Sequence, residues 1–165
     1  MFHTGNGTPC FHEAESIPEI KRIVSEYEPG LVIELGTKNG GLTEYLQDAT
    51  DSPIWSYDII ALPLGKKFRD NVTFCITDIL SKPHNSLIGL CKSNVKKILY
   101  CDNGNKIKEF KMYAQYLNKG DILGVHDWGT EINYDAVKEV LTDFEPYESD
   151  FFIENKLKTR FWKRG

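Results

Sequence analysis

Short apolar runs that alternate with longer amphipathic stretches constrain the fold of this chain more than any other feature. The clearest run, LVIEL at 31–35, has the composition of a parallel strand that is buried on both faces. Similar runs lie at 54–57, 72–76, 98–101 and 122–125, and stretches with helical spacing separate them. This rhythm predicts repeated strand–helix–strand units around a mostly parallel sheet.

The length of 165 residues fits one domain. The first residues contain Gly5, Gly7 and Pro9, so we expect a mobile N-terminal arm over 1–14 and a single domain over 15–165. Ser16 and Glu19 have the spacing of a capping box at the start of a helix. The tail predicts two strands, at 147–153 and 159–163, around a polar turn.

Charge and cysteine content exclude several classes of protein. The net charge is −4 and the isoelectric point is about 5.6, which argues against a nucleic-acid partner or an anionic membrane surface. No apolar run approaches the roughly 20 residues of a membrane span. A zinc site or a disulfide framework is not expected, since no CxxC pair occurs among Cys10, Cys75, Cys91 and Cys101. We therefore expect a cytoplasmic protein.

A glycine-rich turn follows the first strand, with the sequence ELGTKNGG from Glu34 to Gly41. Glycines let the backbone turn sharply and approach a ligand closely, and the helix that follows offers free N–H groups. The spacing matches neither the GxGxxG of a dinucleotide-binding turn nor a phosphate-binding loop. Asp58 ends the second strand, 24 residues after Glu34. An acid there can accept both hydroxyls of a ribose, in NAD and in S-adenosylmethionine (SAM) alike, or it can simply cap a turn.

The pattern E-x-G-x-x-x-G after a strand resembles motif I of the class I SAM-dependent methyltransferases. Two later segments strengthen this resemblance: CDNGN from Cys101, and LNKGDILGVHD from Leu117. Together they resemble the small-molecule O-methyltransferases of the macrocin and catechol type, over residues 31–129. The resemblance implies a Rossmann-like three-layer α/β sandwich whose seven-stranded, mostly parallel sheet ends in an antiparallel C-terminal hairpin.

The resemblance also implies which residues bind SAM. In that family an acid after the third strand meets the adenine amino group and its apolar neighbour packs on the ring, which assigns Asp78 and Ile79 to these roles. The implied SAM-binding residues are Glu34, Gly36, Thr37, Gly40, Gly41, Asp58, Asp78, Ile79 and Asp102.

Asp102, His126 and Asp127 would surround a divalent metal ion by the same resemblance, and they are the implied catalytic residues. Mg²⁺ or Mn²⁺ there would lower the pKa of a substrate hydroxyl. His126 could instead act as a base without metal. The sequence departs from the family at Asn105, where a histidine or a lysine is usual, and Lys106 lies one residue further on. A second departure is Asp121, which replaces a glycine.

These observations predict a SAM-dependent methyltransferase that transfers a methyl group to a hydroxyl of a small molecule. The alternative is a non-catalytic Rossmann-like ligand-binding module, or a subunit of a larger methyltransferase, because no insertion for substrate recognition is evident. The acceptor site would then be open or completed by a partner subunit, for instance in a homo-oligomer. Methylation of a nucleic-acid base is disfavoured, since no N/D-P-P-Y run follows the fourth strand.

Overall fold

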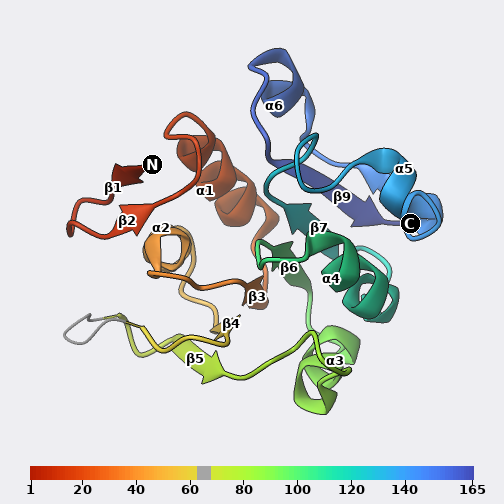
Figure 1. Cartoon of the computed structure of the whole chain (residues 1–165), viewed down its shortest axis with the longest axis horizontal. Helices are drawn as coiled ribbons and strands as arrows, with labels where there is room; N and C mark the ends of the chain where they lie inside the picture. The colour runs from red at the N-terminus through yellow and green to blue at the C-terminus, as the bar shows by residue number, and fades with distance from the viewer. Residues whose placement is uncertain (63–67) are drawn as a thin grey trace.

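Five parallel strands and two antiparallel strands form a seven-stranded sheet in the computed structural model of the chain, which describes residues 1–62 and 68–165 (Figure 1). The order is β5-β4-β3-β6-β7-β9-β8, and β9 and β8 are the antiparallel strands. The strands are β3 (Leu31–Leu35), β4 (Ile54–Asp58), β5 (Val72–Ile76), β6 (Lys97–Cys101), β7 (Ile122–Val125), β8 (Phe144–Pro146) and β9 (Arg160–Arg164). The predicted sheet, with its C-terminal antiparallel hairpin, is confirmed.

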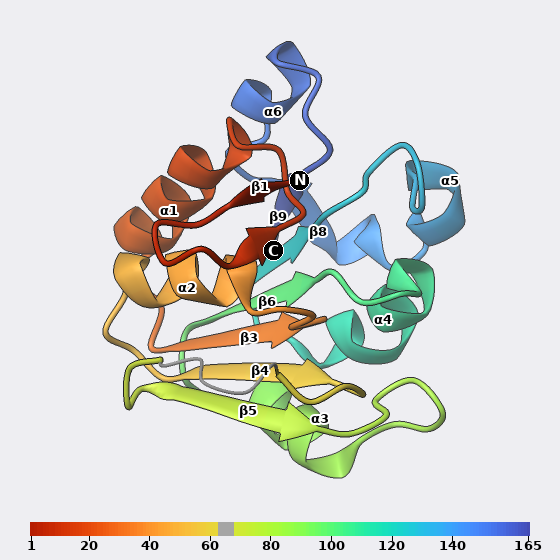
Figure 2. The same cartoon turned by 60° about the vertical axis from the view of Figure 1, so that its left-hand side comes forward.

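Helices cover both faces of this sheet (Figures 1 and 2). Successive side chains of a strand point to opposite faces. Val32 therefore packs with the helices of one face, and Ile33 packs with those of the other. The first face carries α1 (Ser16–Tyr27) and α2 (Gly41–Ala49), and the second carries α3 (Asn85–Lys92), α4 (Lys106–Tyr113) and α5 (Tyr134–Val137). Short 3₁₀ turns lie at Ala114–Tyr116 and Leu141–Asp143.

The N-terminal arm packs against the domain as a small hairpin of β1 (Phe2–His3) and β2 (Pro9–Cys10) (Figure 2). The hydroxyls of Thr4 and Thr8 donate hydrogen bonds to the Glu44 carboxylate on α2. The side chain of Cys10 is 1% exposed. The structure thus gives residues 1–14 a defined place on the domain, and their mobility stays a prediction.

Two local predictions were wrong. The segment expected as a strand at 147–153 contains the short helix α6 (Asp150–Glu154), because one helical turn buries Phe152 alone and leaves its apolar neighbours outside. The capping box is not formed: the Ser16 hydroxyl donates to the Glu13 carbonyl, and Glu19 pairs with Arg22. No helix in the described parts of the chain has both the length and the apolar character needed to cross a membrane.

Candidate active site

A cavity of about 500 Å³ opens where β3, β4, β6 and β7 end. Five of the predicted site residues line it: Gly36, Asp58, Asp102, His126 and Asp127. In open parallel sheets, ligands bind at the carboxyl ends of the strands, so this cavity is the candidate active site.

The glycine turn forms one wall of the cavity, but its glycines are required by the protein's own backbone. Gly36 has φ +99°, and a Cβ there would lie 2.4 Å from the carbonyl oxygen of Asp102. A Cβ on Gly41 would lie 2.5 Å from the carbonyl oxygen of Pro9 in the arm. Gly40 also has a positive φ, of +78°, and Thr37 is buried against the hydroxyl of Ser56. Of these four residues, only Gly36 lines the main cavity.

Asp58 is held rigidly at the cavity by backbone N–H groups. Its Oδ2 accepts from the N–H of Lys38 at 2.6 Å, and its Oδ1 accepts from the N–H of Ile60 at 3.1 Å. Each carboxylate oxygen has a second lone pair, so the group can still accept further hydrogen bonds. The side chains of Ile59 and Ile60 line the same cavity and are 60% and 66% exposed. This apolar pair was not predicted from the sequence, and its signal there is two aliphatic residues directly after the acid that ends a strand.

Three further predicted SAM-binding residues also do not line the cavity. Glu34 is fully buried, its Oε2 accepts from Thr43 and Ser56, and burial raises its pKa to about 7. Asp78 instead holds a turn, because its Oδ1 accepts from the N–H groups of Leu80 and Ser81. The expected adenine contact of Ile79 is corrected, since its fully buried side chain belongs to the core under α3 and α4.

Asp102, His126 and Asp127 converge as the sequence predicts, because β6 and β7 are neighbouring parallel strands. The Nδ1 atom of His126 lies 3.3 Å from Oδ1 of Asp102 and 3.4 Å from Oδ2 of Asp127. Burial lowers the pKa of His126, but its hydrogen bond with Asp102 and the charges of both aspartates outweigh burial and raise it. The geometry of the cluster is confirmed, and the catalytic roles of its members stay a prediction.

Lys106 completes this cluster, which settles the question that its position left open. Its Nζ lies 3.1 Å from Oδ2 of Asp127, 3.5 Å from Oδ1 of Asp102 and 2.8 Å from Oε2 of Glu131. The side chain is 4% exposed. Burial lowers its pKa, yet the charge of Asp102 and the hydrogen bonds to Glu131 and Asp127 outweigh burial and raise it. Lys106 is therefore a charged ammonium at neutral pH.

The arm adds a second imidazole to the cluster. The ring of His12 stacks on that of His126, with centroids 4.1 Å apart, and its Nε2 lies 3.5 Å from Oδ2 of Asp102 without a hydrogen bond. Burial lowers the pKa of His12 to about 4, so this ring is neutral. Among the described residues, His12, Asp102 and His126 could each offer one ligand atom to a metal ion, since these atoms lie within 4.8 Å of one another.

Asp102 and Asp127 do not fit a divalent cation between them as they are arranged. Oδ1 of Asp102 and Oδ2 of Asp127 both contact the Lys106 ammonium and the His126 ring. A Mg²⁺ ion bound by these oxygens would lie about 2 Å from each, and hence within about 5 Å of the ammonium nitrogen. Two cations at that separation repel each other strongly in a partly buried site.

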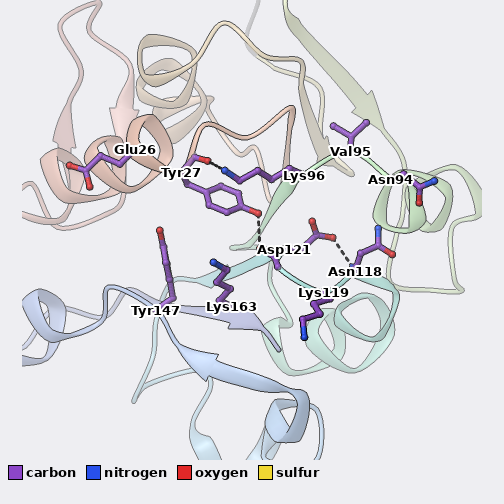
Figure 3. A pocket seen from close by; sticks show the side chains of 11 residues that line it. Glu26, Tyr27, Asn94, Val95, Lys96, Asn118, Lys119, Asp121, Tyr147 and Lys163 are labelled. Atoms are coloured by element: carbon purple, nitrogen blue, oxygen red, sulfur yellow. Dashed lines mark hydrogen bonds between the residues drawn. The ribbon is translucent and has the colours of Figure 1, made fainter.

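A second cavity of similar size, about 490 Å³, lies at the opposite ends of the strands, and Figure 3 shows the side chains that line it. Its walls include Tyr27, Tyr147, Lys96 and Lys163, and it lies where β6 and β7 begin. None of the predicted site residues lines it in the described parts of the chain. Since parallel sheets bind ligands at the other end of their strands, we assign no reaction to it.

No family model and no curated protein matches the chain. Solved structures do match. A structure of CmcI with Mg and SAM has a TM-score of 0.74 and 16% identity, over 99% of this chain and 76% of that chain. MycE methyltransferase in complex with Mg, S-adenosylhomocysteine (SAH) and mycinamycin VI has a TM-score of 0.61 and 14% identity, over 91% and 46%. Human N-acetylserotonin methyltransferase with SAM has a TM-score of 0.61 and 10% identity, over 91% and 52%. The chain thus has the fold of the class I SAM-dependent methyltransferases, as the sequence predicts.

Proposed function

We propose that this protein is a SAM-dependent methyltransferase that transfers a methyl group to a hydroxyl of a small molecule. One observation carries the proposal. A single cavity of about 500 Å³ joins the glycine turn, the strand-end acid Asp58 and the cluster of Asp102, His126 and Asp127. Solved structures with this fold that contain SAM or SAH support the same assignment.

The residues of the cavity fit SAM. Asp58 is fixed by two backbone N–H groups, and its remaining lone pairs can accept the two ribose hydroxyls. The exposed side chains of Ile59 and Ile60 would pack against the adenine ring. Backbone at Gly36 lies in the cavity wall without a side chain to block the amino-acid end of SAM. When bound, SAM supplies an electrophilic methyl carbon that the acceptor oxygen attacks, so that an O–C bond forms while the C–S bond breaks and its electron pair stays on sulfur.

His126 takes the proton of the acceptor hydroxyl in this proposal. Its Nδ1 faces two carboxylate oxygens, which only accept hydrogen bonds, so Nδ1 carries a proton. Nε2 is the other ring nitrogen, and it lies 3.4 Å from Oε2 of Glu13, so the acceptor hydroxyl must take the place of Glu13 before Nε2 can accept its proton. The two aspartates stabilise the imidazolium that forms, in keeping with the raised pKa of His126. The proton then passes to solvent.

Calorimetric titration with SAM, SAH and NAD tests the cofactor. We expect saturable binding of SAM and SAH, and binding of NAD alone would overturn the proposal. Incubation with methyl-labelled SAM and a panel of phenols and sugars then tests transfer. His126→Ala should lose at least about 100-fold in rate, the usual contribution of a general base, while SAH binding is kept. Binding of SAH by the wild type without transfer to any acceptor would support a non-catalytic binding module.

A further inference from the structure

Lys106 reaches the cluster because of how α4 begins. The side chain of Asn105 caps the helix by accepting from the N–H of Lys108, which makes Lys106 its first residue. The Lys106 side chain then runs back to the end of β6, where Nζ also donates to the carbonyl oxygen of Asn103 at 3.1 Å. The ammonium is thus built into the site by a helix cap and is not a mobile surface charge.

The Lys106 ammonium is surrounded by oxygen atoms, as a bound metal ion would be. An ammonium has three donors, and Nζ has four oxygen neighbours, on Asn103, Asp102, Asp127 and Glu131. The two aspartate oxygens next to it are those that would face a shared metal ion. If the Lys106 ammonium moved away, the carboxylates of Asp102 and Asp127, which are only 16% and 21% exposed, would lose this cation. The cation position between Asp102 and Asp127 is therefore already filled by the chain itself.

We propose that Lys106 is a built-in counter-cation that takes the position of a divalent metal ion between Asp102 and Asp127, so that this pair of carboxylates binds neither Mg²⁺ nor Mn²⁺. This inference rests on the proposed function, and it implies that methyl transfer does not depend on a metal ion. Glu131 is the most exposed of the four neighbours, at 54%, so its hydrogen bond is the one that an acceptor oxygen can replace. Lys106 lines the cavity, and its charge would favour a developing oxyanion there.

Titration of the full-length protein with MgCl₂ and MnCl₂, followed by calorimetry and by the electron paramagnetic resonance signal of free Mn²⁺, tests the proposal. The wild type should show no saturable site in the millimolar range that Asp127→Asn removes. Lys106→Met removes the charge and keeps the apolar stem, so it should gain Mn²⁺ affinity of at least about tenfold, equivalent to about 1.4 kcal/mol. Lys108→Met, an exposed lysine two residues along the same helix, is the matched control and should behave as the wild type.

Saturable metal binding by the wild type that is lost in Asp127→Asn would overturn the proposal, since Asp127 belongs to the Lys106 position and not to the set of His12, Asp102 and His126. So would a folded Lys106→Met that binds no more Mn²⁺ than the wild type. Lys106→Gln is the second variant if the methionine variant does not fold, and the affinity gained in either should be lost when Asp127→Asn is added. SAH binding is measured on the same samples. Its absence would count against the proposed function and leave the metal result readable.

Discussion

Two lysines meet carboxylates at opposite ends of the same pair of strands. At the amino end, Lys97 begins β6 and its Nζ lies 2.5 Å from Oδ2 of Asp121, which directly precedes β7. At the carboxyl end, Lys106 meets Asp102 and Asp127, which follow the same two strands. Asp121 also lines a cavity, but the side chains of the first pair are only 0% and 3% exposed, whereas those of Asp102 and Asp127 are 16% and 21% exposed.

The number of partners explains the difference between the two ends. Asp121 also accepts from the backbone N–H groups of Lys97 and Asn118, so one carboxylate satisfies one cation and two amides (Figure 3 shows the bond from Asn118). At the other end, two aspartates, two imidazoles and one ammonium share a partly open space, and Nε2 of His12 has no hydrogen bond. A closed pair holds the strands together, and an open cluster retains groups that a ligand can use.

Breaking the closed pair should have the largest effect on stability. Lys97→Met leaves the Asp121 carboxylate buried without its cation, so the free energy of unfolding should fall by about 3–5 kcal/mol. Urea denaturation measures this loss. Lys119→Met, at an exposed lysine nearby, should change stability little. Adding Asp121→Asn to Lys97→Met removes the unpaired charge and keeps an acceptor for the backbone N–H groups, so it should restore much of the loss. A loss below 1 kcal/mol would contradict the structural role of the pair.

Glu34 offers a buried carboxyl without a cation, and its stability contribution should depend on pH in a defined direction. Its folded-state pKa, about 7, lies above the ordinary value of 4.5. Its contribution is therefore fully present below about pH 4.5 and is lost as pH rises to about 7. Glu34→Gln stays neutral, so its stability relative to the wild type should rise by up to about 3 kcal/mol between pH 4.5 and pH 8. Urea denaturation across this range tests it, and parallel pH curves for the two proteins would contradict it.

Features of the fold that depend on a local sequence pattern could be predicted from the sequence. The apolar runs predicted the strands of the sheet. The places where two of these runs end predicted that Asp102, His126 and Asp127 lie together. Lys106 could not be placed, because its reach depends on the first turn of α4. His12 could not be placed either, because the contact joins residues 90 positions apart, His12 and Asp102. Asp121 stands where the family has a glycine, and the sequence did not explain this difference. In the structure, Asp121 is the ion-pair partner of Lys97.

The glycines show the limit of motif reasoning most clearly. The motif assigned Gly36 and Gly41 to a bound cofactor, and the structure gives each a steric reason within the chain. The adenine contact predicted for Ile79 is corrected for a different reason. Its position after a strand suited an exposed contact, but the turn that Asp78 holds directs the side chain into the core.

Asp58 gives a prediction that concerns binding alone. Asp58→Ala removes the acceptor of the ribose hydroxyls, so the free energy of SAM binding should weaken by about 1.5–3 kcal/mol, the range for hydrogen bonds to a charged group. Calorimetric titration measures the dissociation constant. Asp78→Ala is the matched control, because that acid lies outside the cavity and its loss should leave the constant unchanged. An unchanged constant in Asp58→Ala would remove this residue from the site.

The smallest expected effect concerns the attachment of the arm. The Cβ of Gly41→Ala would meet the Pro9 carbonyl oxygen at 2.5 Å, and this oxygen belongs to the hairpin of β1 and β2, which is not part of the seven-stranded sheet and can shift away from α2. The cost should therefore be about 1–2 kcal/mol, toward the lower end of the range for overpacking. Hydrogen exchange should show faster exchange at residues 2–12 and little change in β3 and β6. Gly89→Ala, where a Cβ would meet nothing within 4 Å, is the control.

Because His12 reaches Asp102 only while the arm is packed, a detached arm should also raise the pKa of His12 toward its ordinary value, which its NMR titration would report. Unchanged exchange and an unchanged His12 titration would mean that the arm is not held by its contact with Gly41.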